Sequence, residues 1–258
     1  MGEAATPKGA VVRLLVTCTI IALNEADRIG LTIASVQGLV DEILVIDSGS
    51  TDGTQKLCEG LGARVIINPW TGYGPQKRFA EDAARNDIIL NLDADEWLGD
   101  DLRTELAELF AAPDLPRKSY RMNVTILYPH RARPALFADS NNCLRLYDRR
   151  VTRFANSLVH DEVVPTPDVG QLQAPVLHRS FRSLGHLVRK DIAYFELQAE
   201  ELKKKRWKLL ARAPFEFPLQ VFKFYILRRH IFGGLYGLVF SLSLAFVRWL
   251  RLFILMGW

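Results

Sequence analysis

Residues 88–97 read I-I-L-N-L-D-A-D-E-W, an apolar run that ends in three carboxylates, Asp93, Asp95 and Glu96. A short Ile/Leu run bounded by charge is typical of a buried strand in a parallel sheet. Its acids should therefore lie at the carboxyl end, where open α/β sheets hold ligands. Asp93 and Asp95 are two residues apart and would point to one side of a regular strand. Such carboxylates suit Mg2+ or Mn2+ together with a substrate phosphate. Alternatively, Asp95 only caps a helix over about 99–110.

Alternating apolar and amphipathic segments precede this stretch. They predict strands at 14–23, 43–46 and 63–67, and helices at 26–36, 54–61 and 76–85. Asn24 is the expected N-cap of the first of these helices. Strand and helix alternating with short connections indicate a doubly wound fold. The predicted fold class is therefore α/β, with a mostly parallel Rossmann-like sheet and helices on both faces.

Acids follow three of the predicted strands. Because parallel strands share one carboxyl edge, all three sets should reach the same place; they are Glu25 with Asp27, Asp47 with Asp52, and Asp93 with Asp95. If these acids were only helix caps, three separate caps would have to fall at the same edge by coincidence. Capping is therefore the weaker interpretation. The loop S-G-S-T-D-G-T at 48–54 lets backbone N–H groups approach a ligand closely. The sequence has neither G-x-G-x-x-G after the first strand nor G-x-x-x-x-G-K-[ST] anywhere, so a nucleotide bound through a metal is the remaining expectation.

Charge is distributed unevenly along the 258 residues, although the formal net charge is only +4. Acids gather in the first 115 residues, whereas Lys and Arg gather beyond Arg117. A basic, aromatic-rich second half suits an anionic membrane surface or a phosphate-bearing substrate. Nucleic acid is not an expected partner, because the basic residues are interleaved with long apolar runs. Cys18, Cys58 and Cys143 form no C-x-x-C pair, which is consistent with a reducing cytoplasm.

Four segments resemble an inverting GT-A glycosyltransferase of family 2, especially the branch with the lipopolysaccharide core β-glucosyltransferases of Gram-negative bacteria. They are T-I-I-A-L-N-E-A-D-R-I (19–29), V-I-D-S-G-S-T-D-G-T (45–54), P-W-T-G-Y-G-P-Q-K-R-F-A (69–80) and L-D-A-D-E (92–96), in matching order and spacing. The resemblance continues more loosely to about Leu187. It implies a GT-A catalytic domain over 1–185, with a nucleotide-sugar half at about 12–110 and an acceptor half at about 111–185.

The same resemblance implies a site for the donor. Asp47 would hydrogen-bond the base of a nucleoside diphosphate, most often uridine. Leu23, Asn24 and Glu25 would flank the base and the ribose. Lys77 would contact the nucleotide or its diphosphate.

The resemblance also implies a metal site. Asp93 and Asp95 would form the D-x-D pair, in which Asp95 binds Mg2+ or Mn2+ directly and Asp93 binds the metal or the ribose. His178 follows the apolar stretch A-P-V-L and would complete the coordination as a neutral imidazole. A hydrogen-bonded core histidine is the alternative. Glu96 should face away from Asp95 and support the following helix.

A second acidic group, V-H-D-E-V at 159–163, offers a general base. An inverting transfer needs a carboxylate that takes the proton from the attacking hydroxyl. The resemblance makes Asp161 the candidate and Glu162 the second choice, although relatives usually carry Glu where Asp161 stands. A solvated acidic turn is the alternative. Arg131, Arg133 and Arg145 would either meet an anionic acceptor or form a solvated face.

Residues 186–258 predict a helical membrane-interface region. The cationic run E-E-L-K-K-K-R-W-K-L-L at 200–210 suits a helix lying among lipid headgroups. Pro214 and Pro218 should then interrupt the helix. The uncharged run 231–247, about 17 residues long, is at the lower limit for a spanning helix. We expect peripheral or monotopic attachment to the cytoplasmic face of the inner membrane; spanning, or a soluble helical appendage, are the alternatives.

Taken together, these features predict a metal-dependent inverting glycosyltransferase. It would move a hexose, with glucose as the first expectation, from a UDP-sugar to a lipid-anchored glycan acceptor such as lipopolysaccharide inner core. A polyprenyl-phosphate glycosyl synthase is the alternative enzyme. A non-catalytic membrane scaffold that retains a nucleotide-binding fold is the alternative from another class.

Overall fold

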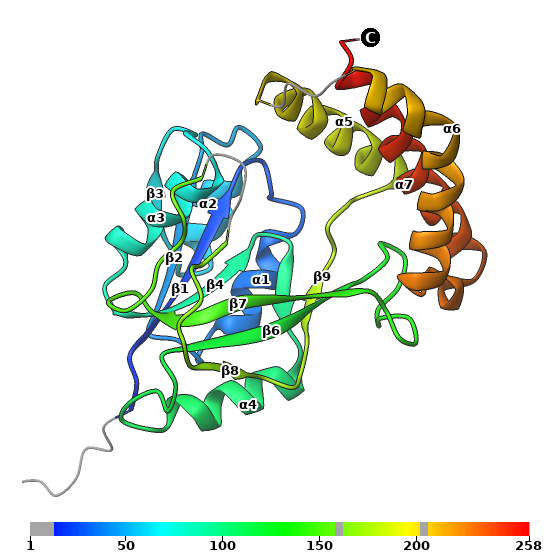
Figure 1. Cartoon of the computed structure of the whole chain (residues 1–258). Helices are drawn as coiled ribbons and strands as arrows, with labels where there is room; N and C mark the ends of the chain where they lie inside the picture. Colours follow the sequence, from blue (N-terminus) through cyan, green and yellow to red (C-terminus); the bar gives the residue numbers. More distant parts are fainter. Residues whose placement is uncertain (1–12, 158–161, 202–205, 258) are drawn as a thin grey trace, which may run out of the picture. The chain divides into compact units, whose positions relative to one another are not determined.

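The computed structural model describes residues 13–157, 162–201 and 206–257, which form two compact units (Figure 1). The first unit consists of Met1–Val124 together with Asn141–His178, and the second of Thr125–Ser140 together with Arg179–Trp258. The junction at 178/179 lies shortly before the expected boundary at 185/186. The segment Thr125–Ser140 joins the C-terminal helices, which the sequence pattern did not indicate.

A nine-stranded sheet organises the first unit, in the order β3-β2-β1-β4-β7-β6-β9-β5 with β8 beside β6. The neighbours β3, β2, β1 and β4 are parallel, whereas β7 is antiparallel to β4 and β5 is antiparallel to β9. The parallel half is therefore confirmed, and the later strands make the sheet mixed. The strands are β1 (Val16–Ala22), β2 (Glu42–Asp47), β3 (Arg64–Ile67), β4 (Ile88–Asp93), β5 (Glu96–Leu98), β6 (Ser119–Ile126), β7 (Ser140–Asp148), β8 (Val169–Gln171) and β9 (Val176–His178).

Helices cover both faces of this sheet, as predicted. The helices are α1 (Ile29–Val36), α2 (Thr54–Gly60), α3 (Tyr73–Ala83) and α4 (Asp100–Phe110). Successive strand residues point to opposite faces: Val45 packs with the apolar side chains of α1 and α4, whereas Leu44 and Ile46 pack with Ala80 of α3. Because both faces are buried there, β1, β2 and β4 are apolar at most positions.

The starts of α1 and α4 test two predictions about helix caps. The prediction that Asn24 caps the first helix is wrong, because α1 begins after Arg28. Asn24 instead adopts a left-handed conformation with φ of 55°, which Asn tolerates better than most residues. Asp95 does not cap α4, whose N-cap is Gly99. The capping interpretation of the acidic strand end is therefore excluded.

The second unit is helical. Its elements are α5 (Leu184–Glu201), α6 (Arg206–Phe222), a π-helical turn η1 (Lys223–Leu227), a 3-10 turn η2 (His230–Gly233) and α7 (Gly234–Ile254). Helix α7 packs against both α5 and α6 (Figure 1). Arg229, with φ of 61°, reverses the chain between η1 and η2. Within the described residues, the helical stretch His230–Ile254 is the one whose length and composition would allow it to cross a membrane.

Pro214 and Pro218 lie inside α6, so the prediction that they interrupt the helix is wrong. Each proline removes one backbone N–H donor. The helix persists because it packs along α7 over much of its length. Next to Pro214, the carbonyl of Ala213 accepts a hydrogen bond of 3.0 Å from Nε1 of Trp249 on α7. Tertiary contact thus overrides a local helix breaker.

Candidate active site

The carboxyl ends of three parallel strands lie side by side at one edge of the sheet. In the strand register, Ala22 of β1 is paired with Asp47 of β2, and Ile21 of β1 is paired with Asp93 of β4. The structure therefore brings Asp47 and Asp93 to the shared edge that the sequence pattern predicts. The loops that leave these strands form the rest of the site.

Asp47 is completely buried at the end of β2. Its Oδ1 atom accepts hydrogen bonds from the backbone N–H groups of Gly49 (2.9 Å) and Ser50 (2.7 Å), and from Nε2 of Gln55 (2.7 Å). Burial by itself raises the pKa of Asp47, but these hydrogen bonds and that from the Ser50 hydroxyl hold it below the ordinary value. The carboxylate is ionised and fixed in orientation, while its contact with a base stays a prediction.

The loop after β1 is tied to the loop after β2. The backbone N–H groups of Asn24, Glu25 and Ala26 donate to side-chain oxygens of the second loop, at 2.8, 2.9 and 3.1 Å. The side chain of Leu23 is 49% exposed, and that of Asn24 beside it is exposed as well. The predicted base-flanking residues thus form a rigid platform with an open apolar side chain.

Asp93 lies between two cations. Its Oδ1 atom is 2.8 Å from Nζ of Lys77 on α3, and its Oδ2 atom is 3.0 Å from Nη2 of Arg145 on β7. Both cations also donate to Oδ1 of Asn91, at 3.2 and 3.0 Å. Burial opposes ionisation, but the charges of Lys77 and Arg145 keep the pKa of Asp93 well below its usual range. The fully buried Lys77 therefore neutralises Asp93, and its contact with a nucleotide stays a prediction.

Two charged residues of this cluster were misjudged from the sequence. Glu96 does not support α4: it is completely buried, its Oε2 atom accepts the Asp93 N–H at 3.1 Å, and its Oε1 atom pairs with Arg145. Burial raises the pKa of Glu96 in spite of the Arg145 charge. Arg145 is 6% exposed, so the solvated-face interpretation is wrong for it. A lone Arg inside the strand-like run C-L-R-L-Y was a usable signal, because a buried charge requires a partner.

Asp95 faces a histidine from a distant strand. The antiparallel pairing of Glu96 with His178 brings Nε2 of His178 to 3.3 Å from Oδ1 of Asp95. The other carboxylate oxygen is 3.3 Å from Nη1 of Arg28, which the sequence interpretation did not select. Burial disfavours the ionised carboxylate of Asp95 and the protonated imidazole of His178. The interaction with His178 nevertheless lowers the pKa of Asp95, and the interaction with Asp95 raises that of His178.

The donor types at this point fit a divalent cation. Among the described residues, no group of three or more His, Cys, Asp or Glu side chains is arranged to hold a metal. However, Asp95 and His178 present a carboxylate and an imidazole toward each other, and Mg2+ or Mn2+ sites often use few protein ligands together with substrate phosphates. Asp93 is paired with Lys77 and Arg145, and Asp95 is paired with Arg28 and His178. The metal ligands therefore stay a prediction, with Asp95 and His178 as the carboxylate and imidazole that lie together.

The candidate base Asp161 lies outside the described residues. The chain just before it packs on the first turn of α3, where the Gly74 N–H donates to the Ser157 carbonyl at 2.9 Å. A Cβ atom at Gly74 would lie 2.3 Å from the carbonyl oxygen of Ala155, so glycine permits this close approach. Glu162, the second choice, is exposed.

The two other arginines considered for an anionic acceptor belong to the second unit. Arg131 lies over the ring of Tyr128, with its guanidinium carbon 5.9 Å from the ring centroid. Arg133 is exposed. Their contact with an acceptor stays a prediction.

Comparisons with known proteins cover most of the chain. Residues 17–163 match the family model described as glycosyl transferase family 2. An uncharacterized glycosyltransferase of Rickettsia felis is 40% identical over 248 residues, which cover 92% of this chain and 88% of the relative. The lipopolysaccharide core biosynthesis glycosyltransferase LpsC of Rhizobium meliloti is 33% identical over 202 residues, covering 73% of this chain and 72% of that protein. A crystal structure of S. aureus TarS 1-349 in complex with UDP-GlcNAc has a TM-score of 0.48 and 13% identity, over 73% of this chain and 66% of that one.

Proposed function

Because the chain belongs to glycosyl transferase family 2, we propose that this glycosyltransferase moves a hexose, with glucose first, from a UDP-sugar to a lipid-anchored glycan. The observation that carries the proposal is the pairing of Asp95 with His178, at the edge where Asp47 ends β2. The similarity to LpsC, whose name refers to the lipopolysaccharide core, supports an inner-core glycan as the acceptor class.

In the proposed reaction, Asp47 orients the uracil base and the platform around Leu23 supports the base and ribose. Asp95 and His178 would hold Mg2+ or Mn2+, which would supply Lewis-acid stabilisation for the charge that develops on the diphosphate. Arg28, 3.3 Å from Asp95, fixes the orientation of that carboxylate. Lys77 and Arg145 keep Asp93 ionised beside it.

On the acceptor side, the hydroxyl oxygen attacks the anomeric carbon while the bond from that carbon to UDP breaks. The hydroxyl proton passes to the carboxylate of Asp161. A positioned base of this kind contributes about 10²–10⁴ in rate.

We expect Asp161→Asn to lower kcat by about 10²-fold or more, because the amide cannot take the proton. Release of UDP in the presence of acceptor membranes measures the effect. Glu162→Gln, which removes the neighbouring charge, is the matched control and should keep most of the activity.

Full turnover in Asp161→Asn would contradict the base assignment. Together with activity on a polyprenyl phosphate, it would favour the alternative enzyme, since an ionised phosphate acceptor needs no base.

We also propose that the second unit attaches the enzyme to the cytoplasmic face of the inner membrane as a monotopic element. The hairpin of α6 and α7 exposes large apolar side chains, among them Phe215, Leu219, Phe222, Leu227, Phe232 and Leu235. The sequence from Arg206 onward contains one acid, Glu216, and the cations Arg206, Lys208, Arg212, Lys223, Arg228, Arg229, Arg248 and Arg251. Apolar surface among cations is the pattern of an interfacial anchor. Because α7 packs on two other helices, lying in the interface suits it better than spanning.

A donor screen tests the proposed reaction. The full chain is incubated with nucleotide sugars, Mn2+ and membrane extract, and release of nucleoside diphosphate is measured. UDP-glucose should give the highest rate, and chelation of the cation should abolish it. Release that depends on membrane extract but occurs only with a non-uridine donor would refute the UDP assignment. An absence of UDP binding would favour the scaffold alternative.

A further inference from the structure

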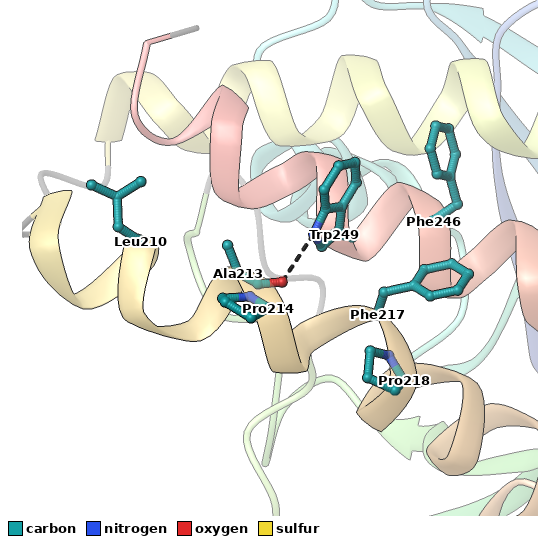
Figure 2. A pocket seen from close by; sticks show the side chains of 7 residues that line it. All are labelled: Leu210, Ala213, Pro214, Phe217, Pro218, Phe246 and Trp249. Atoms are coloured by element: carbon teal, nitrogen blue, oxygen red, sulfur yellow. Dashed lines mark hydrogen bonds between the residues drawn. The ribbon is translucent and has the colours of Figure 1, made fainter.

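A pocket of about 600 Å³ opens between α6 and α7 of the second unit (Figure 2). Among the described residues, no charged side chain lines it. Its walls are Leu210, Ala213, Pro214, Phe217 and Pro218 from α6, and Phe246 and Trp249 from α7. Phe246 and Leu210 are 45% and 47% exposed, so the apolar walls continue onto the surface of the hairpin.

A hydrogen bond between α6 and α7 and the small or ring-shaped side chains of α6 define the pocket. Nε1 of Trp249 donates to the Ala213 carbonyl at 3.0 Å, which satisfies the polar edge of the indole and ties the two helices together (Figure 2). The small side chain of Ala213 leaves space beside the indole. Pro214 and Pro218 contribute rings without N–H groups. The side chains that line the space are therefore apolar, apart from the indole N–H that is already bonded.

The net positive charge of the chain from residue 206 onward decides between possible occupants. Beyond Arg206 cations outnumber acids strongly, and the one acid, Glu216, is 7% exposed and accepts hydrogen bonds from Arg212 (2.8 Å) and Gln220 (3.0 Å). A second copy of the same hairpin would carry the same net positive charge and be repelled. An anionic lipid offers both a hydrocarbon chain and a complementary headgroup.

We propose that the α6–α7 pocket binds one hydrocarbon chain of an anionic membrane phospholipid. A captured chain and the net positive charge of the helical hairpin are two attachment signals, and two signals give stable membrane anchoring where one gives weak binding. The inference rests on the membrane attachment proposed above and is independent of the sugar chemistry.

The test uses the full chain with Trp249 as its single tryptophan, the others being replaced by Phe, and with circular dichroism as the check of folding. Vesicles contain phosphatidylglycerol with bromine atoms at mid-chain, which quench tryptophan on contact. Trp249 fluorescence should be strongly quenched. Ala213→Phe fills the pocket and should lose most of the quenching, whereas Ala211→Phe adds the same ring at an exposed position outside the pocket and should retain it.

Native mass spectrometry of the otherwise unaltered chain provides a second measurement. One phosphatidylglycerol per chain should remain bound, be lost in Ala213→Phe and persist in Ala211→Phe. Equal quenching and equal adducts in both variants would overturn the inference, as would a dimer in lipid-free solution that Ala213→Phe dissociates. Vesicle binding without quenching would overturn the pocket alone. No vesicle binding at all would overturn both the pocket and the membrane attachment, while the donor screen remains a separate test of the transferase.

Discussion

Asp95→Ala should abolish sugar transfer, with kcat/KM falling by about 10³-fold or more, because the variant loses a carboxylate proposed to hold the cation that stabilises the leaving diphosphate. Asp95 is 8% exposed, so the substitution removes a side chain directed into the site and not a surface charge. UDP release at saturating Mn2+ measures the loss, and titration with UDP should show weakened, Mn2+-independent binding.

The matched control is Asp101→Ala, which removes an exposed acid from the first turn of α4 and should leave the rate nearly unchanged. Because Asp95 also pairs with Arg28 and His178, the variant's melting temperature must be measured in parallel. A folded Asp95→Ala protein that keeps more than about a tenth of the wild-type kcat/KM would contradict the assignment, since it retains all but about 1.4 kcal/mol of the transition-state stabilisation.

Asp93→Asn should lower the free energy of unfolding by about 3 kcal/mol, because it removes a carboxylate that lies 2.8 Å from the buried Lys77 ammonium. Denaturant unfolding near pH 7 measures this value. The matched variant Lys77→Met removes the charge but keeps an apolar stem. In a double-mutant cycle, Lys77→Met with Asp93→Asn should recover much of the lost stability. Additive losses would show that the pair is not coupled.

The loss of unfolding free energy caused by Asp93→Asn should depend on pH in a defined direction. Lys77 and Arg145 hold the folded-state pKa of Asp93 well below the unfolded value of about 3.9. The stability contributed by the ionised carboxylate is therefore fully present above the unfolded pKa and is lost as the pH falls through the folded pKa. The difference between wild type and variant should be largest near neutral pH and shrink in strong acid. A difference that grows on acidification would refute this assignment of charge.

Much of the first unit could be predicted because its signals are local. The runs that become β1, β2 and β4 are apolar at most positions, since both faces of the sheet are covered. The parallel arrangement then places Asp47 and Asp93 at one edge. The later strands were harder, since β7 and β9 join the sheet by antiparallel pairing over long sequence separations.

Errors in the sequence interpretation arose where distant contacts override local preference. Asn24 looks like a helix cap, but its side-chain oxygen accepts the Thr51 N–H at 2.9 Å and the helix starts later. Pro214 and Pro218 look like helix breakers, but packing of α6 on α7 carries the helix through them. In each case a tertiary contact outweighs an intrinsic preference of a few kcal/mol at most.

By itself, the sequence determined the parallel half of the sheet, the edge at which the acids gather and the membership of glycosyl transferase family 2. Only the tertiary structure decided which partners those acids have: Asp93 pairs with Lys77 and Arg145, whereas Asp95 pairs with Arg28 and His178. Strand periodicity and loop composition are properties of neighbouring residues and can be read locally. Ion pairs between residues on different elements depend on burial and register, which exist only once the chain has folded.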